Sequence, residues 1–237
     1  NLQGNLGYYT STNGRGTRYA PGDYITSSRA IYLYDKNGVC SDQHRINIDI
    51  HKTPTWTYDG NPYCVTNTLS HPASNFNGHP GGTFSSSEGL SLNSATGAIN
   101  PSGSTPGDYT VYYDVNDPEC GPLRGQTQVS IKALSDGGSI EGQENVCLGS
   151  TFTLTSADRT GNVIGWQYSY DNNSWSDIPN SSSNTYVVQN ISTRILYRVK
   201  VQNSPCSVAY SSVKTISVFP PFSAGSILSG SETICHS

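Results

Sequence analysis

The sequence predicts an all-β fold made of β-sandwich modules in tandem, with partial modules at both ends of the chain. Its length of 237 residues exceeds the roughly 100 residues of one such sandwich. Only 13% of the residues are charged, while 24 glycines and 13 prolines favour short strands and many turns over amphipathic helices. The third observation is an internal repeat, which indicates a structural unit that recurs along the chain.

The repeat sets the boundaries of one complete module. Gly138-Ser139-Ile140, followed by Cys147, returns as Gly225-Ser226-Ile227, followed by Cys235. The two cysteines are 235 − 147 = 88 positions apart, which is close to the length of one sandwich. We therefore assign residues 134–220 to one module.

Strand signals inside this module are regular. Ile195, Tyr197, Val199 and Val201 alternate with mostly polar residues, and this period of two predicts a half-buried antiparallel strand. Pro220-Pro221 cannot continue a strand in the middle of a sheet and is expected to form the linker to the next module.

One tryptophan specifies the kind of sandwich. Trp166 lies 166 − 147 = 19 positions after Cys147, where an immunoglobulin-like sandwich keeps a buried tryptophan against the disulfide between its two sheets. We therefore predict immunoglobulin-like modules, with Trp166 in the core of the module at 134–220.

The remaining residues divide in the same way. Residues 52–133 are predicted to form a second immunoglobulin-like or cadherin-like module, bracketed by Cys64 and Cys120. Residues 1–51 hold too few strand segments for a sandwich and are assigned to the C-terminal part of another module. Residues 221–237 are assigned to the start of a further module.

Six cysteines with no CxxC pair indicate disulfides and an oxidising, extracellular compartment. Six cysteines allow 15 pairings, from which the module boundaries select Cys64 with Cys120 and Cys147 with Cys206. Cys40 and Cys235 are then left without partners in this chain.

Charge and hydropathy argue against a nucleic-acid partner and against a transmembrane segment. The formal net charge of −4 and the scattered lysines and arginines provide no basic face, so a nucleic-acid partner is not expected. No apolar run approaches the roughly 20 residues that cross a bilayer, so the sequence predicts no transmembrane segment.

Candidate catalytic residues are sparse, and we expect no enzymatic activity and no catalytic residue. The chain has no Gly-x-Ser-x-Gly elbow and no HExxH motif. None of its histidines has the short spacing of a metal ligand set, so surface or loop roles are expected for His44, His51, His71, His79 and His236.

One group of oxygen side chains is a candidate calcium site. Asp114, Asn116, Asp117 and Glu119 fall within six residues, and calcium prefers such oxygen ligands. An acidic turn gives the same pattern, so a plain loop is the alternative. No other cofactor is expected.

Three stretches of the chain resemble the repeat modules of very large Bacteroidota surface adhesins that are exported by type IX secretion, a group that includes the SprB-like gliding-motility adhesins. The residues that carry the resemblance are Gly7 to Thr10, Ile31 to Tyr34, Gly82 to Ser85, Ser104 to Val111, Cys147, Trp166, Tyr197 to Val199 and Cys206. The resemblance implies a repetitive adhesive stalk on the bacterial cell surface, and it implies no catalytic residue.

The sequence leaves three hypotheses for function. The first is a non-catalytic segment of an exported adhesin or stalk, whose partners are the neighbouring modules of the same chain and surface glycans or other cells. The second is a set of accessory carbohydrate-binding modules of a secreted polysaccharide-degrading enzyme, because aromatic side chains stack on sugar rings. The third is a filament subunit that exchanges strands with its neighbours.

Overall fold

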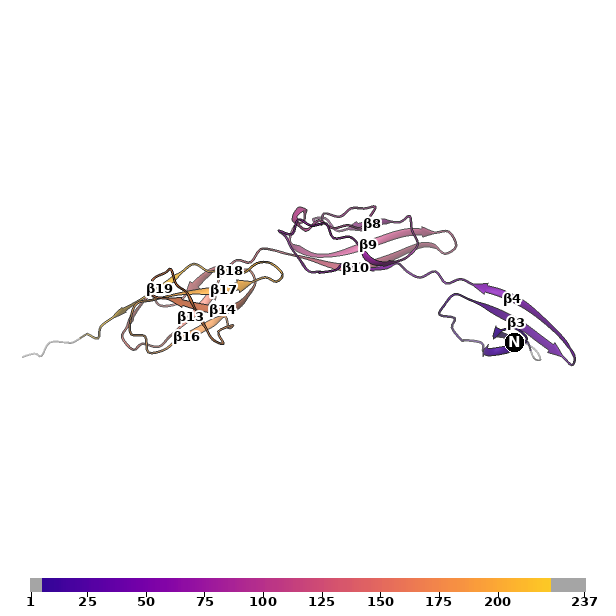
Figure 1. Cartoon of the computed structure of the whole chain (residues 1–237), viewed down its shortest axis with the longest axis horizontal. Coiled ribbons are helices and arrows are strands. Elements are labelled where there is room, and N and C mark those ends of the chain that lie inside the picture. Colours follow the sequence, from indigo (N-terminus) through magenta and orange to yellow (C-terminus); the bar gives the residue numbers. More distant parts are fainter. Residues whose placement is uncertain (1–5, 223–237) are drawn as a thin grey trace, which may run out of the picture.

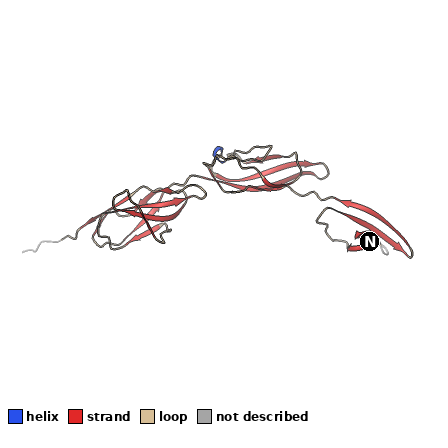
Figure 2. Ribbon diagram, viewed as in Figure 1, coloured by secondary structure: helices blue, strands red, loops and turns tan. Residues whose placement is uncertain are grey.

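The computed structural model describes residues 6–222 as three bodies of β-structure that follow one another along an extended chain (Figure 1). These residues form 19 strands, and their one helical element is a 3₁₀ turn, Pro101–Gly103 (Figure 2). The predicted all-β class is therefore confirmed. Across residues 6–222, no helix has the length and apolar character needed to span a membrane.

The third module, assigned above to residues 134–220, consists of two sheets. One sheet has the order β11-β13-β16, with bounds Ser139–Glu141, Phe152–Ala157 and Thr185–Val188. The other has the order β12-β19-β17-β14-β15, with bounds Asn145–Cys147, Lys214–Phe219, Ile195–Gln202, Asn162–Ser169 and Ser176–Ile178, and β18 (Ala209–Tyr210) pairs with β17. The chain crosses between the sheets before and after β16, which is the strand order of an immunoglobulin-like sandwich.

Alternation along the strands builds the core of this module. In β17, Tyr197, Val199 and Val201 are buried as the period of two predicts. Trp166 on β14 is fully buried and packs in the same cluster, whose other members include Leu154 and Ile216. Burial of each large apolar side chain stabilises such a core by about 1.5–3 kcal/mol.

The second module, assigned above to residues 52–133, repeats this strand order with fewer strands. One sheet is β6-β10-β9-β8, with bounds Tyr63–Cys64, Gly121–Lys132, Gly107–Asp117 and Thr83–Ser86. Opposite it, β5 (Thr55–Thr57) pairs with β7 (Ser74–Asn77). The core between them is rich in aromatic rings, and Trp56 meets Phe84 edge to face with centroids 5.4 Å apart.

The N-terminal sheet is a single layer. Its order is β2-β1-β3-β4, with bounds Arg15–Tyr19, Gly7–Ser11, Arg29–Asn37 and Cys40–Ile48. This order matches β15-β14-β17-β19 of the third module, so the sheet corresponds to the second half of an immunoglobulin-like unit. Within residues 6–51, Ile31 is the one buried large hydrophobic side chain, because no second sheet covers this one.

Candidate functional site

The candidate functional site is the pair of junctions that connect the three bodies. The first junction is the linker of residues 49–54, between the end of β4 and the start of β5. The second junction is the linker of residues 133–138, between β10 and β11. Each linker has six residues, so neighbouring bodies are held close together.

The third module fixes the second junction by hydrogen bonds. The Asn203 side chain donates to the carbonyl oxygen of Ala133, and the Asn203 backbone N–H donates to the Ser135 hydroxyl, both at 2.9 Å. Asp136 and Thr160 exchange two backbone hydrogen bonds of 3.0 Å. The linker is therefore an ordered part of the third module rather than a free tether.

A disulfide crosses the second junction. Cys64 of the second module bonds to Cys206 of the third, with their Cα atoms 5.0 Å apart, within the usual range for a disulfide. The sulfur of Cys206 also lies 3.2 Å from the carbonyl oxygen of Ala133 in the linker. The bridge therefore ties one module to the next.

The predicted pairings, Cys64 with Cys120 and Cys147 with Cys206, are wrong. Cys64 pairs with Lys132 at one end of the β9–β10 hairpin, whereas Cys120 lies in the turn at its other end. Cys120 and Lys132 are 132 − 120 = 12 positions apart along β10, which is roughly 41 Å at about 3.4 Å per residue, and a disulfide needs Cα atoms within about 7 Å.

The same geometry separates the second predicted pair. Cys147 pairs with Phe219 at the far end of β19, while Cys206 lies at the end of the module that faces Ala133. Cys147, Cys120 and Cys40 are free and exposed. Cys235 lies outside the described residues.

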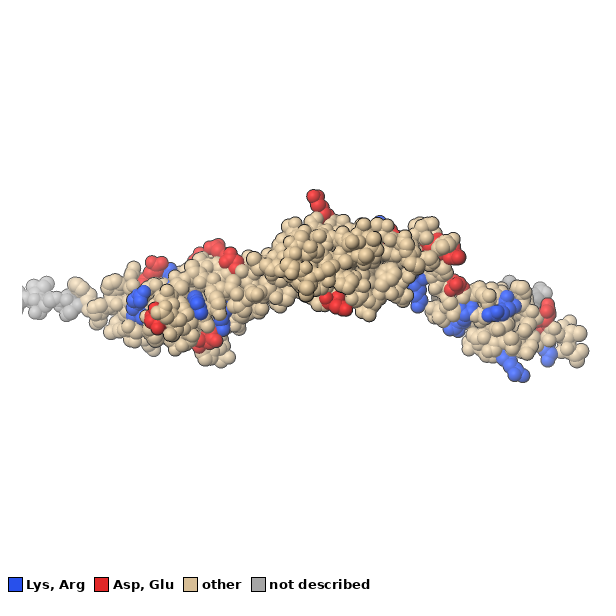
Figure 3. All heavy atoms as spheres, turned by 45° about the horizontal axis from the view of Figure 1, so that its top comes forward, with Lys and Arg blue, Asp and Glu red and all other residues tan. Residues whose placement is uncertain are grey.

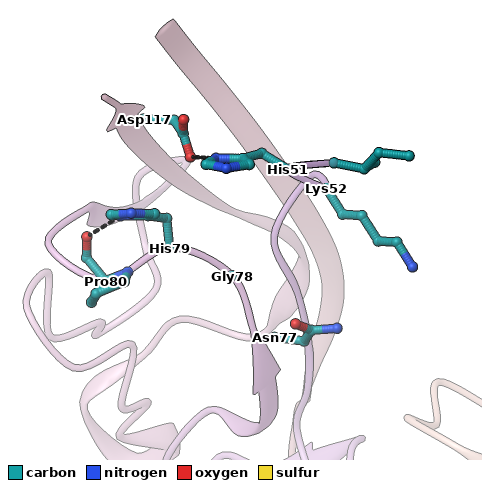
Figure 4. A pocket seen from close by; sticks show the side chains of 8 residues that line it. His51, Lys52, Asn77, Gly78, His79, Pro80 and Asp117 are labelled. Atoms are coloured by element: carbon teal, nitrogen blue, oxygen red, sulfur yellow. Dashed lines mark hydrogen bonds and ion pairs between the residues drawn. The ribbon is translucent and has the colours of Figure 1, made fainter. Parts of the chain in front are cut away.

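At the first junction, a histidine of the linker binds the hairpin turn of the second module (Figure 4). His51 Nδ1 lies 2.6 Å from Asp117 Oδ2, and the Asp117 carboxylate is almost completely buried. The other oxygen of Asp117 accepts the backbone N–H groups of Glu119 and Cys120 at 3.0 and 2.9 Å. The His51 ring also stacks on His79, with centroids 6.3 Å apart, beside a pocket of about 430 Å³.

These contacts shift the pKa of both partners. Burial opposes ionisation of Asp117, but the hydrogen bonds from His51 and from the Cys120 and Glu119 backbones outweigh it and lower the pKa to about 2. The hydrogen bond to Asp117 raises the pKa of His51, and the charges of Asp117, Asp49 and Glu119 act in the same direction. The pair is therefore arranged as an ion pair that anchors the linker.

The same site offers donors for a metal ion. One ligand atom each from His51, Asp117 and Cys120 lies within 4.8 Å of the others, and these residue types bind zinc. However, the His51 ring and two backbone N–H groups already satisfy the Asp117 carboxylate. The arrangement is therefore explained as a linker anchor without an ion.

The structure divides three of the predicted calcium ligands between the two faces of β9. Asp114 and Asn116 occupy the outward positions of β9, and Asp114 binds Arg124 through two hydrogen bonds of 2.6 and 2.9 Å. Asp117 faces inward and binds His51. Because successive strand residues point to opposite faces, Asp117 lies on the face of β9 opposite to Asp114 and Asn116.

The sequence offered little signal for the first junction. His51 and Asp117 are 66 positions apart, so no short motif joins them, and His51 was expected to have a surface or loop role. For the second junction, the informative feature is the end of the strand at which each cysteine lies. The sequence does not show this feature until the pairing of the strands is known.

Three comparisons with known proteins give the following matches. A family model described as "Domain of unknown function (DUF8696)" matches residues 136–220, which contain the third module. No curated protein sequence matches the chain.

Several solved structures have a similar course of the chain at low identity. A crystal structure of titin domains has a TM-score of 0.41 at 12% identity, covering 90% of this chain and 88% of that one. The four N-terminal Ig domains of Dscam1 isoform 9.44 give 0.39 at 12% identity, with 92% and 65% coverage. A calcium-stabilised adhesin of an Antarctic bacterium that binds ice gives 0.33 at 9% identity, with 93% and 66% coverage.

The present chain thus spans slightly less than two thirds of the Dscam1 and adhesin chains. The fold assignment itself rests on the strand order described above. By that order, residues 6–222 form a tandem array of immunoglobulin-like units.

Proposed function

We propose that this chain is a non-catalytic repeat segment of an exported cell-surface adhesin, in which it spaces and orients modules along a stalk. The observation that carries this proposal is the Cys64–Cys206 bridge, because it joins consecutive modules instead of closing one. A disulfide in this position fixes how one module stacks on the next. A spacer between modules needs this property.

Two further features support the proposal. Disulfides persist in oxidising compartments, which favours export from the cell. In Figure 3, charged side chains lie singly or in small groups on the outer bodies and are sparse over the central one, so no face of one sign is visible. Export by type IX secretion from a member of the Bacteroidota, and a part in gliding, are further proposals that rest on the sequence resemblance.

The test is whether the protein lies on the cell surface and contributes to attachment. Antibodies raised against the purified chain should label intact cells of the source organism and reduce their attachment to a solid surface. Antibodies that label the cells only after permeabilisation would contradict the proposal. Antibodies from non-immunised animals provide the control.

Carbohydrate binding is the second candidate, and one surface of the third module favours it. The Arg198 guanidinium lies 4.2 Å from the Trp175 ring centroid and 4.1 Å from that of Tyr210. Asp177 accepts hydrogen bonds nearby from Gln167 and Lys200. Aromatic rings beside charged groups are suited to stacking on a sugar and bonding its hydroxyls.

This candidate is tested by binding to a glycan array. Retention of a glycan by the unaltered chain, and its loss in Trp175→Ala and Tyr210→Ala, would support a sugar site. Tyr24→Ala is the matched control, because Tyr24 is 89% exposed on the N-terminal segment. Equal retention by all variants would exclude this surface.

A further inference from the structure

We propose that Cys147 is one half of a further disulfide between modules, and that its partner is the cysteine between the last two long strands of an immunoglobulin-like module stacked on the β12/β19 end of the third module. This inference rests on the proposed spacer function and names the partner of that end. It is carried by the equivalence of cysteine positions in the two complete modules.

Cys64 and Cys147 occupy the same place in their modules. Cys64 is the last residue of β6, which runs parallel to β10 and pairs with its last residue, Lys132. Cys147 is the last residue of β12, which runs parallel to β19 and pairs with its last residue, Phe219. Both cysteines therefore lie where the chain leaves the module, and Cys64 uses this place to bond to the next one.

The other half of the bridge also recurs. Cys206 follows β17 and precedes β19, and it lies against the preceding linker. Cys120 lies between β9 and β10 beside His51 of the first linker, and Cys40 begins β4 after β3. Each unit thus carries a cysteine at the end opposite to that of Cys64 and Cys147, so a bridge runs from one module to the following module.

The surroundings of Cys147 fit a stacked module. Cys147 is free and exposed, and its neighbours Leu148 and Phe219 are 51% and 54% exposed. These apolar side chains lie at the end of the third module that would contact the following module. Removal of such apolar surface from water favours contact with a stacked module.

The sequence after Phe219 identifies the occupant. Gly225-Ser226-Ile227 repeats Gly138-Ser139-Ile140, the motif with which the third module begins. Ser139 follows Lys132 by seven positions, and Ser226 follows Phe219 by seven positions. The repeat therefore returns with the linker length of the second junction, which favours a further module of the same kind over an unrelated partner.

The bond forms by thiol–disulfide exchange with an oxidised disulfide such as glutathione disulfide. A deprotonated cysteine attacks the glutathione disulfide, forms a mixed disulfide and releases one glutathione thiolate. The second cysteine thiolate then attacks the protein sulfur of the mixed disulfide and releases the second glutathione. The two protein thiols lose two electrons and two protons, and one glutathione disulfide becomes two glutathione molecules.

The test extends the chain by one module in the native register. Residues 1–225 are followed by a second copy of residues 139–222, refolded with reduced and oxidised glutathione, alkylated, digested and analysed by mass spectrometry. We expect a Cys64–Cys206 peptide and a second peptide that links Cys147 to Cys206 of the added copy. Cys147→Ser in the first copy should abolish the second peptide, whereas the same substitution in the added copy should leave it unchanged.

Two outcomes would overturn the inference. If Cys64–Cys206 forms while Cys147 of the first copy is fully alkylated, the inference is wrong and the spacer proposal stands. If the linked peptide disappears with the substitution in the added copy instead, the bridge closes a single module and the inference is also wrong. Absence of the Cys64–Cys206 peptide itself would remove the basis of both proposals.

Discussion

The indole N–H of Trp166 donates a hydrogen bond to the backbone carbonyl oxygen of Ser183 at 2.9 Å, and no part of the Trp166 side chain is exposed. We predict that Trp166→Ala lowers the free energy of unfolding of the third module by about 3–5 kcal/mol, the usual range for removal of a core aromatic. Urea unfolding monitored by circular dichroism measures this loss.

Trp175→Ala provides the comparison. Trp175 is half-buried under Arg198, so its removal should cost about 1 kcal/mol, the scale of a surface cation–π contact. Equal losses for the two substitutions would contradict the assignment of Trp166 to the core.

The His51–Asp117 pair predicts a pH-dependent first junction. The raised pKa of His51 contributes stability that is complete below 6.5 and is lost as pH rises through the raised value. The lowered pKa of Asp117 contributes stability that is present above 3.8 and is lost as pH falls toward about 2. The junction should therefore be most stable between pH 3.8 and 6.5.

Titration of the histidine ring signals by NMR checks this prediction. The His51 midpoint should lie above 6.5 and fall in Asp117→Asn, whereas Asp114→Asn should leave it in place because Asp114 binds Arg124. A His51 midpoint at or below 6.5 in the unaltered chain would contradict the ion pair.

Loss of the bridge between modules should loosen the second junction while both sandwiches stay folded. Cys64→Ser should broaden the distribution of molecular shapes in small-angle X-ray scattering. It should also lower the free energy of unfolding by at most about 5 kcal/mol, the chain-entropy value for a loop of 142 residues. Cys147→Ser is the control and should change neither quantity, since Cys147 is free.

Gly137 should tolerate no side chain. A Cβ atom at this position would overlap with the backbone of Tyr210 and Ser211. The backbone of the linker or of the third module would therefore have to move. Gly137→Ala should destabilise the third module by about 1–3 kcal/mol in thermal unfolding, as overpacking does. Gly107→Ala should have a smaller effect, because its Cβ would meet only the Tyr109 side chain at 3.4 Å or more.

The sequence predicted local structure better than the contacts between units. The alternation of Tyr197, Val199 and Val201 predicted a strand that the structure contains, because a half-buried strand imposes this period. The cysteine pairing was predicted wrongly, because a pairing chosen by position along the chain ignores which end of the hairpin each cysteine occupies. Cys64 and Cys120 both lie next to β10 in space, but at opposite ends of it.

The bridge between Cys64 and Cys206 also defines how the chain would carry tension. A pull on the two ends passes from Cys64 directly to Cys206, so the 142 positions that the bond spans lie outside the load-bearing path. At about 3.3–3.6 Å per extended residue, the disulfide prevents the extension of roughly 470–510 Å of chain. Most of both sandwiches could unfold under load without lengthening the molecule, and a stalk bridged in this way would keep its reach.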